Sequence, residues 1–440
     1  MDPITLCLLI FGIMLALMVV RVPIAVAMFV AGTTGYLLQA GWLPYANFLK
    51  TQTYSRFSNY DLSVIPLFLL MGQFATHGGL SRALFAFANA MMSRVRGGMA
   101  MAAVIACAAF GAVCGSSVAT AATVSSVALP EMTRHRYTGR LTPATLAAGG
   151  TMGIMIPPSV ILIIYAILTE QNIAKLFAAA TIPGLIAMLG YLIAIAVYVR
   201  LVPGHAPEKV VVERIDVRDA LLGLGPILVI FLLVFGGIYA GIFTPTEGAA
   251  VGAVSTLVLA LARGELTRAK LATSFYQAAE SSAMIFLIFI GADVMNSALA
   301  LTQVPNQLAQ AVGASGWPPL AIVGTILVFY VILGCVMDEL SMILLTIPIF
   351  FPMIMGLDLW GLDPTGKAIW FGVLILMVVG IGLIAPPVGL NVYIVNGLAK
   401  GVPIAETYRG VVPFLISDFI RTIILLFVPS LSLFLLRFMD

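Results

Sequence analysis

Charge is scarce in this chain, and that scarcity excludes most classes of soluble protein. Only 9% of the 440 residues are charged, whereas 61% are hydrophobic; soluble domains carry about 25% charged residues. Many apolar windows reach the ~20 residues that a helix needs to cross a bilayer. We therefore predict an all-α integral membrane protein. The alternating pattern of a membrane β-barrel is missing, and a net charge of +3 gives no indication of nucleic-acid binding.

Motifs for catalysis and metal binding are also lacking. The three histidines and four cysteines have neither zinc-ligand nor redox spacing. No HExxH or GxSxG motif occurs, and the run GAVCGSS lacks the lysine of a phosphate-binding loop. No soluble segment is long enough for a nucleotide-binding domain. An intramembrane enzyme is therefore the least favoured class, and we expect no organic cofactor and no transition metal.

One long apolar segment, residues 99–130, is polar and glycine-rich at its centre. Gly-Ser-Ser stands at 115–117, and Thr120 follows one turn later. A chain break at membrane depth must face protein or a watery cavity, because lipid offers no hydrogen-bond partners. Arginines flank both ends, Arg94 and Arg140 among them, and cationic loops stay cytoplasmic. The pattern predicts a re-entrant helical hairpin with its tip at 115–117; a single glycine-kinked helix is the alternative.

The chain divides at a charged stretch, residues 201–220, into a first half (1–200) and a second half (221–440). We interpret this stretch as a cytoplasmic linker, and residues 42–60 as an aromatic, polar connection at the membrane interface. Landmarks of the first half return in the second at nearly one spacing. These pairs are Pro23 with Pro245, Pro130 with Pro352, Gly153 with Gly382, and Pro157-Pro158 with Pro386-Pro387.

The repeat predicts a hairpin and a broken helix in each half. In the first half, a span at 144–168 is interrupted by glycines and by Pro157-Pro158; the second half offers a hairpin at 321–352 and a broken helix at 368–395. The flanks of the second hairpin contain almost no Lys or Arg, so we expect it to enter from outside. Two repeats of opposite topology are typical of secondary transporters with a binding site near the bilayer midplane.

Helices that break inside a membrane offer binding groups for ions. A helix C-terminus presents unpaired carbonyls, which suit a cation, and an N-terminus presents N–H groups, which suit an anion. We predict that Na⁺ is the coupling ion, with Ser116 and Asp338 at the two tips. The full set of expected cation-site residues is Gly115, Ser116, Ser117, Gly150, Gly153, Pro157, Asp338, Gly382 and Pro386.

Hydroxyl and amide side chains near the same breaks are the candidates for contacting substrate. They are Ser117, Thr120, Ser159, Ser341 and Asn391. Asp338 has three open roles, because a carboxylate there can bind a cation, carry a proton or cap the helix that follows. We place no arginine within a span to hold a substrate carboxylate.

Four separated segments resemble one transporter family. They are GAVCGSSVATAATVSSVALPEM, LAAGGTMGIMIPPSVILIIYAILTEQNIAKLF, GIFTPTEGAAVGAV and GLIAPPVGLNVYIVNG. Together they resemble the large permease (DctM-type) subunit of TRAP transporters, the tripartite ATP-independent periplasmic family. The resemblance implies a Na⁺-coupled importer of an organic acid in a bacterial inner membrane. It also implies two partners, a periplasmic solute-binding protein and a separate small four-helix membrane subunit.

The family is in turn similar to the divalent-anion/Na⁺ symporters, which use an elevator motion. That similarity implies that each hairpin tip faces an unwound span. Those symporters carry Ser-Asn-Thr at a tip, whereas this chain has Gly-Ser-Ser, so the mode of substrate contact stays open. A stand-alone Na⁺/dicarboxylate symporter is the alternative function.

Overall fold

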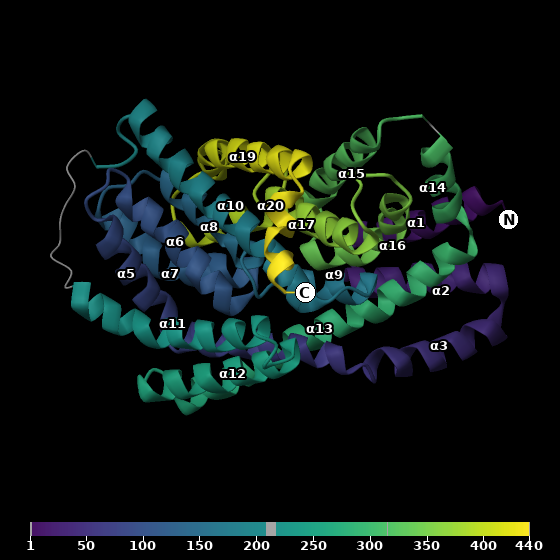
Figure 1. Ribbon diagram of the computed structural model, residues 1–440, viewed down its shortest axis with the longest axis horizontal. Coiled ribbons are helices and arrows are strands. Elements are labelled where there is room, and N and C mark those ends of the chain that lie inside the picture. Colours follow the sequence, from purple (N-terminus) through teal and green to yellow (C-terminus); the bar gives the residue numbers. More distant parts are fainter. Residues whose placement is uncertain (1, 208–216, 315, 440) are drawn as a thin grey trace.

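Helices account for all the regular secondary structure in the part of the chain that the structure describes. The computed structural model describes residues 2–207, 217–314 and 316–439, and no strand occurs within them (Figure 1). Six helical segments there are long and apolar enough to cross a membrane, or seven if one bent pair is counted as a span. The expectation of an all-α membrane protein is confirmed.

The first half contains ten α-helices and a short 3₁₀ turn, η1, within its described residues. They are α1 (Pro3–Val19), α2 (Ile24–Ala40), α3 (Trp42–Phe57), η1 (Tyr60–Ser63), α4 (Val64–His77), α5 (Leu80–Met92), α6 (Gly98–Cys114), α7 (Ser117–Arg134), α8 (Leu141–Met155), α9 (Val160–Thr169) and α10 (Ile173–Leu201). The interfacial connection expected at 42–60 is thus mostly helix α3. Its exposed face carries Trp42 and Tyr54, which suits the membrane interface.

The second half follows a similar order. Its elements are α11 (Val217–Tyr239), α12 (Pro245–Ala262), α13 (Arg268–Leu301), α14 (Val304–Ala314), α15 (Pro319–Gly334), α16 (Glu339–Met355), α17 (Pro364–Gly382), α18 (Leu390–Leu398), α19 (Ile404–Phe427), α20 (Ser430–Leu433) and η2 (Phe434–Phe438). The expected linker at 201–220 includes residues 208–216, which lie outside the described residues.

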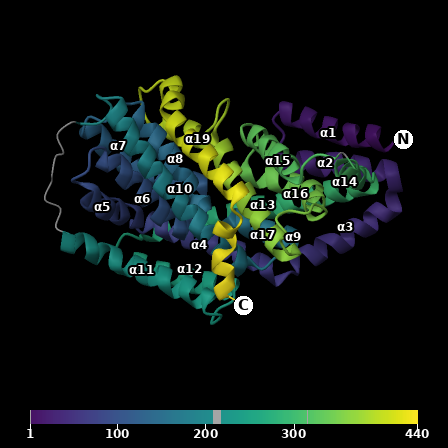
Figure 2. The same cartoon turned by 45° about the horizontal axis from the view of Figure 1, so that its top comes forward.

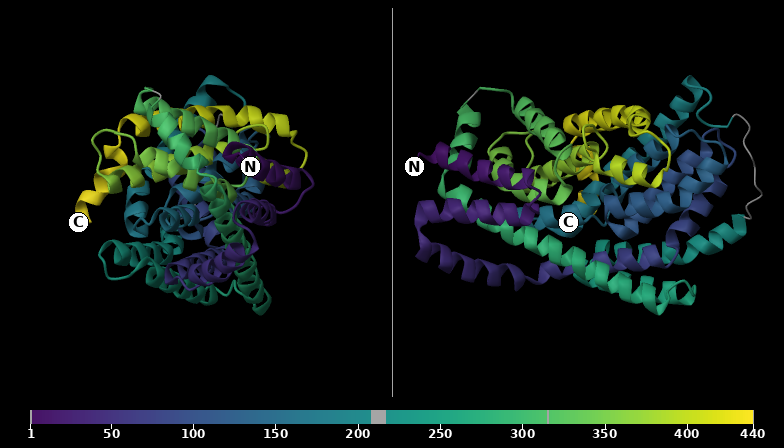
Figure 3. Two further views of the ribbon diagram at one scale, coloured as in Figure 1. Left: turned by 90° about the vertical axis from the view of Figure 1, so that its right-hand side faces the viewer. Right: turned by 180° about the vertical axis from the view of Figure 1, so that it is seen from behind.

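The helices form two groups that lie against each other along the length of the molecule. In the first group, α2 packs on α13, and α4 packs on α12 and α13. In the second group, α6 and α7 both pack on α8, α15 on α17, and α10 on α19. Figure 1 shows α12 and α13 along one long side, α19 along the other and α17 between them, and the right-hand view of Figure 3 shows the same arrangement from behind. We name these groups the outer frame and the hairpin group.

The first hairpin is formed by α6 and α7. Between them Gly115 adopts a left-handed conformation (φ 67°), which glycine accepts without steric cost. The two far ends of the hairpin meet again, because the Met99 N–H donates to the Tyr137 hydroxyl oxygen (3.3 Å). The chain therefore turns back at the tip, and the alternative of a single kinked helix is wrong.

The second hairpin is formed by α15 and α16, with its tip at residues 335–338. Thr346 on α16 donates to the hydroxyl oxygen of Tyr330 on α15 (2.6 Å), which holds the two arms together. Figure 2 shows this hairpin beside α14, whereas α6 and α7 lie beside α5. Both α5 and α14 follow a turn with a left-handed residue, Gly79 (φ 71°) and Gln303 (φ 58°).

Each hairpin is accompanied by an interrupted helix. α8 and α9 are separated by residues 156–159, and α17 and α18 by residues 383–389; each gap contains a cis Pro-Pro bond. The fold therefore contains the hairpin and the broken helix twice, at the positions that the sequence landmarks indicate.

Candidate functional site

The C-terminal ends of α6 and α8 meet in the interior of the hairpin group. Gly111 lies in the last turn of α6 and Gly153 in the last turn of α8. A Cβ at Gly111 would lie only 2.5 Å from the Gly153 Cα, so the two backbones touch. Each helix C-terminus carries about −0.5 of an elementary charge. We call this contact the first junction; two such ends side by side favour a cation.

Oxygen atoms from the hairpin tip line the first junction. A Cβ at Gly153 would lie 2.4 Å from Thr120 Oγ1 and 2.5 Å from the Ser116 carbonyl oxygen. Thr120 is fully buried, and among the described residues its hydroxyl has no oxygen or nitrogen partner and lies only beside the Cys114 thiol. Buried polar groups in proteins are nearly always satisfied, so this hydroxyl is available to a ligand at the junction.

The hairpin tip is joined to the break in α8–α9 through backbone and serine groups. The Gly115 carbonyl accepts from the Val160 N–H (3.4 Å). Ser116 caps α7 by accepting from the Ala119 N–H, and Ser159 caps α9 in the same way. Helices α7 and α9 therefore begin close to where α6 and α8 end. The same region thus offers carbonyl groups to a cation and N–H groups to an anion.

A contact between the two halves adds to the first junction. Ser117 and the Asn391 side chain, on α18, exchange hydrogen bonds of 3.0 and 2.8 Å. Asn391 also donates to the Ala147 carbonyl (3.2 Å) and lies against Gly150. Two of the expected substrate residues are thus bonded to each other, and the bond joins α7 of the first half to α18 of the second.

The second junction repeats the first with a different tip. A Cβ at Gly382 would lie 2.6 Å from the Gly334 Cα, so the ends of α15 and α17 touch. Asp338 caps α16 by accepting from the Ser341 N–H (3.0 Å). Of the roles that the sequence left open, the helix cap is therefore present. The Ser341 hydroxyl is buried and, within the part of the chain that the structure describes, has no hydrogen-bond partner.

The second break is more open than the first. Pro157 is buried, whereas Pro386 is exposed. The Tyr408 hydroxyl lies within hydrogen-bond distance of two carbonyls of the second break, those of Pro387 (3.1 Å) and Val388 (2.6 Å). Among the expected cation-site residues, Gly153 and Gly382 are therefore packed in the two junctions, whereas Pro386 lies outside the packed contact.

Two charged residues within α19 escaped the sequence analysis. Arg421 Nη1 lies 3.0 Å from Asp418 Oδ1, with side-chain exposures of 3% and 0%. The sequence alone could have pointed to this pair, because an aspartate and an arginine three residues apart within an apolar span are rare and usually functional. Arg421 therefore lies within an apolar helix, but its partner there is Asp418, so the expectation that no arginine within a span holds a substrate carboxylate stays a prediction.

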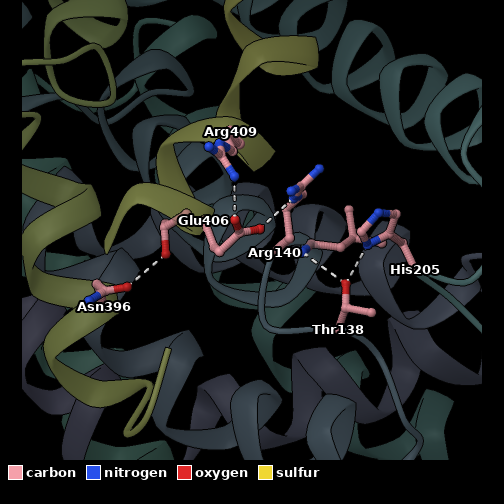
Figure 4. A network of polar contacts seen from close by, with 8 residues as sticks. Thr138, Arg140, His205, Asn396, Glu406 and Arg409 are labelled. Atoms are coloured by element: carbon pink, nitrogen blue, oxygen red, sulfur yellow. Dashed lines mark hydrogen bonds and ion pairs between the residues drawn. The ribbon is translucent and has the colours of Figure 1, made fainter. Parts of the chain in front are cut away.

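A polar network joins the two halves at the end of the molecule that we expect to be cytoplasmic (Figure 4). Arg140, just before α8, donates to Glu406 on α19 (2.7 Å), and Glu406 also accepts from Arg409 (2.8 Å). Nearby, Thr138 pairs with His205 Nδ1 (2.7 Å). Burial lowers the pKa of His205, and the Arg140 guanidinium lowers it further, so this environment favours the neutral imidazole.

Comparison with known proteins places the chain in a family. Residues 11–431 match the family model described as "Tripartite ATP-independent periplasmic transporter, DctM component". The C4-dicarboxylate TRAP transporter large permease protein DctM of Pseudomonas aeruginosa is 36% identical over 88% of both chains. The isethionate TRAP transporter permease protein DctMQ of Oleidesulfovibrio alaskensis is 30% identical over 96% of this chain and 65% of its own length.

A solved structure supports the fold alone. The YdaH transporter of Alcanivorax borkumensis, whose topology is described as unusual, aligns with a TM-score of 0.63 and 16% identity over 89% of this chain and 90% of that one. Members of the matched family are permease components rather than enzymes, and in general they work with a periplasmic binding protein and a small membrane subunit. This chain belongs to the DctM family, the large permease component of tripartite ATP-independent periplasmic transporters.

Proposed function

We propose that this permease imports an organic anion into the cytoplasm across a bacterial inner membrane, with Na⁺ as the coupling ion. The observation that carries the proposal is the first junction, where two helix C-termini, the Ser116 carbonyl and the unpartnered Thr120 hydroxyl converge. Carbonyl and hydroxyl oxygens are hard ligands, and Na⁺ is a hard cation. The second junction supplies a similar setting, with Asp338 at its tip.

The substrate is an anion that binds where the helices α7, α9 and α16 begin. N-terminal N–H groups favour negative charge, and the buried hydroxyls of Thr120 and Ser341 are unpartnered beside them. The two relatives named above carry different substrate names, C4-dicarboxylate and isethionate. Both compounds are organic anions, so we propose an organic carboxylate or a similar anion and leave the compound open.

Movement of the hairpin group against the outer frame is the proposed transport step. The two groups pack mainly within themselves. Helix α5 packs on both α4 of the outer frame and the first hairpin, and α14 packs on both α13 of the outer frame and the second hairpin. An elevator motion of this kind would carry both junctions together across the membrane. We further propose that the small subunit is a separate four-helix chain; the DctMQ relative, which this chain spans over 65% of its length, is a fusion by its name.

Reconstitution of all three components tests the coupling. The permease, its small subunit and the cognate binding protein are placed in liposomes with an inward Na⁺ gradient, and uptake of labelled substrate is measured. We expect uptake that needs both Na⁺ and the loaded binding protein. Uptake that is unchanged when K⁺ replaces Na⁺ would contradict the coupling. Uptake without the binding protein would support the stand-alone symporter instead.

One substitution tests the first junction. Ser116→Ala removes the hydroxyl that caps α7 and lies at the tip. We expect a higher half-saturating Na⁺ concentration with the permease still folded and inserted. An unchanged Na⁺ dependence would remove the Ser116 side chain from the ion site.

A further inference from the structure

A buried ion pair on α19 is connected to the interrupted helix α8 by two hydroxyl groups. Asp418 accepts a hydrogen bond from the Tyr191 hydroxyl through Oδ2 (2.8 Å), while its Oδ1 faces Arg421. The Tyr191 oxygen lies 3.2 Å from Thr151 Oγ1. Thr151, Tyr191 and Asp418 are completely buried. The connection therefore runs from α19 through α10 to α8 without contact with solvent.

The charges in this connection are costly to bury. A paired charge inside a membrane is rarely justified by stability, since apolar residues of similar size often do as well. Among the residues that the structure describes, the Arg421 guanidinium makes no contact of this kind beyond its ion pair with Asp418. Orientation is a better explanation than stability, because a carboxylate only accepts hydrogen bonds. Tyr191 must therefore donate to Asp418, and its oxygen is left to accept from Thr151.

Thr151 lies in the part of α8 that forms the first junction. It stands between Gly150, which contacts Asn391, and Gly153, which contacts Ser116 and Thr120. Glycines give this turn no side chains with which to hold its position. The Thr151 hydroxyl also lies 2.7 Å from the Ala148 carbonyl, so a hydrogen bond to Tyr191 competes with one inside α8. What Thr151 bonds to therefore affects the last turn of the helix.

We propose that Asp418, Tyr191 and Thr151 form a positioning chain that fixes the last turn of α8 at the first junction, with Arg421 holding the carboxylate in place. These are positioning residues, since none of them touches the junction itself. The inference rests on the proposed Na⁺ site at that junction. It predicts that removing a hydrogen bond of the positioning chain weakens ion binding more than it slows transport at saturating Na⁺.

Tyr191→Phe tests the positioning chain, because it removes the hydroxyl group and keeps the aromatic ring. In the reconstituted three-component system, we expect the half-saturating Na⁺ concentration to rise about fivefold to tenfold, as for one lost hydrogen bond, with the maximal rate within about twofold of the unaltered protein. The matched control is Tyr45→Phe, which removes a tyrosine–threonine hydrogen bond between α3 and α2, that of Tyr45 with Thr33 (2.6 Å). This control should leave the Na⁺ dependence unchanged.

A pair of threonine variants covers the case in which Tyr191→Phe does not fold. Thr151→Val removes the hydroxyl and should raise the half-saturating Na⁺ concentration, whereas Thr151→Ser keeps the hydroxyl and should restore it. Equal Na⁺ dependence in the two variants overturns the positioning chain. A fall in maximal rate at unchanged Na⁺ dependence also overturns it, because that result indicates a general structural role.

Hydrogen exchange separates this inference from the proposed function. The amides of residues 148–153 should exchange faster in Thr151→Val than in Thr151→Ser if the chain fixes this turn. If unaltered permease shows no Na⁺ dependence, the proposed coupling fails, and the exchange result still decides the positioning. If Ser116→Ala shifts the Na⁺ dependence but Tyr191→Phe and Thr151→Val do not, the coupling stands and the positioning chain is overturned.

Discussion

The two junctions are built alike, but the first is closed and the second is open. Both join two helix ends through a pair of glycines, Gly111 with Gly153 and Gly334 with Gly382. At the first, the tip is bonded to the break and to the other half of the chain. At the second, Val336 in the tip is 65% exposed and Val388 in the break is 40% exposed.

This difference indicates which of the two hairpins opens more easily. Local opening costs least where few buried contacts and hydrogen bonds hold a segment. The first junction has the buried Ser117–Asn391 pair, whereas Asp338 at the second tip is only partly buried. We infer that the first junction is a preformed site and that the second hairpin opens at lower free energy.

The largest expected effect comes from adding a methyl group at a junction. Gly111→Ala would place Cβ 2.5 Å from the Gly153 Cα, whereas Gly334→Ala, at the matching end of the second hairpin's first arm, meets the Gly382 Cα at 3.2 Å. We expect Gly111→Ala to lose about 1–3 kcal/mol of unfolding free energy and most of its transport. Gly334→Ala should lose less of both. Gly397→Ala, which meets nothing within 4 Å, is the control.

Unfolding in detergent and uptake in liposomes measure this series. If Gly334→Ala is the more damaging change, the two junctions do not differ in tightness as described.

The cross-half bond at the first junction should give the next largest effect. Ser117→Ala removes a partner of the buried Asn391 amide, and an unsatisfied buried group costs about 1–3 kcal/mol. We expect a lower melting temperature and weaker uptake. Ser126→Ala on the same helix is the control, because its hydroxyl is exposed and bonds only to the Thr123 carbonyl. Equal melting temperatures for the two variants would contradict the importance of the bond.

Asp338 tests whether the second tip needs a charge or only a cap. Asp338→Ala should cost about 1 kcal/mol, as other lost helix caps do, while Asp338→Ser keeps an acceptor for the Ser341 N–H. If the carboxylate also binds Na⁺, then Asp338→Ser should fold normally and still need more Na⁺ for uptake. Normal Na⁺ dependence in Asp338→Ser would reduce the role of Asp338 to capping.

The smallest expected effect is at the network of Figure 4, which joins the halves at the surface. Because the pKa of His205 is lowered on folding, the unfolded chain binds more protons, so folding is favoured by the neutral imidazole. This contribution is present above about pH 6.5, the ordinary pKa of histidine, and is lost as the pH falls through the lower folded value. His205→Gln should flatten the acid side of the stability profile between pH 7 and pH 5. A profile unchanged from that of the unaltered protein would contradict this.

The sequence predicted the breaks well because glycine, proline and serine act locally. The expected tip at 115–117 matches the structure, in which α6 ends at Cys114 and α7 begins at Ser117. The second tip and break follow from the same residue types at a constant spacing. Helix ends depend on caps and on backbone freedom, and both can be read from a few neighbouring residues.

Contacts between distant parts of the chain could not be predicted in this way. Ser117 and Asn391 are 274 residues apart, and no periodicity shows that they meet. The same holds for Tyr191 and Asp418, which pair only because α10 packs on α19. Helix α3 was missed because its polar and aromatic residues resemble an interfacial loop, and its helix is supported by packing on α2 and α13.

The opposite orientation of the two hairpins is the claim on which the account depends, and accessibility labelling tests it most directly. In a chain lacking Cys7, Cys107, Cys114 and Cys335, a single cysteine is introduced either by Arg134→Cys, at the last residue of the first hairpin, or by Thr365→Cys, after the second hairpin. Both positions are exposed. In intact cells, a membrane-impermeant maleimide should label Thr365→Cys but reach Arg134→Cys only after the membrane is opened. Labelling of both positions from the same side would contradict the inverted repeat and the transport scheme built on it.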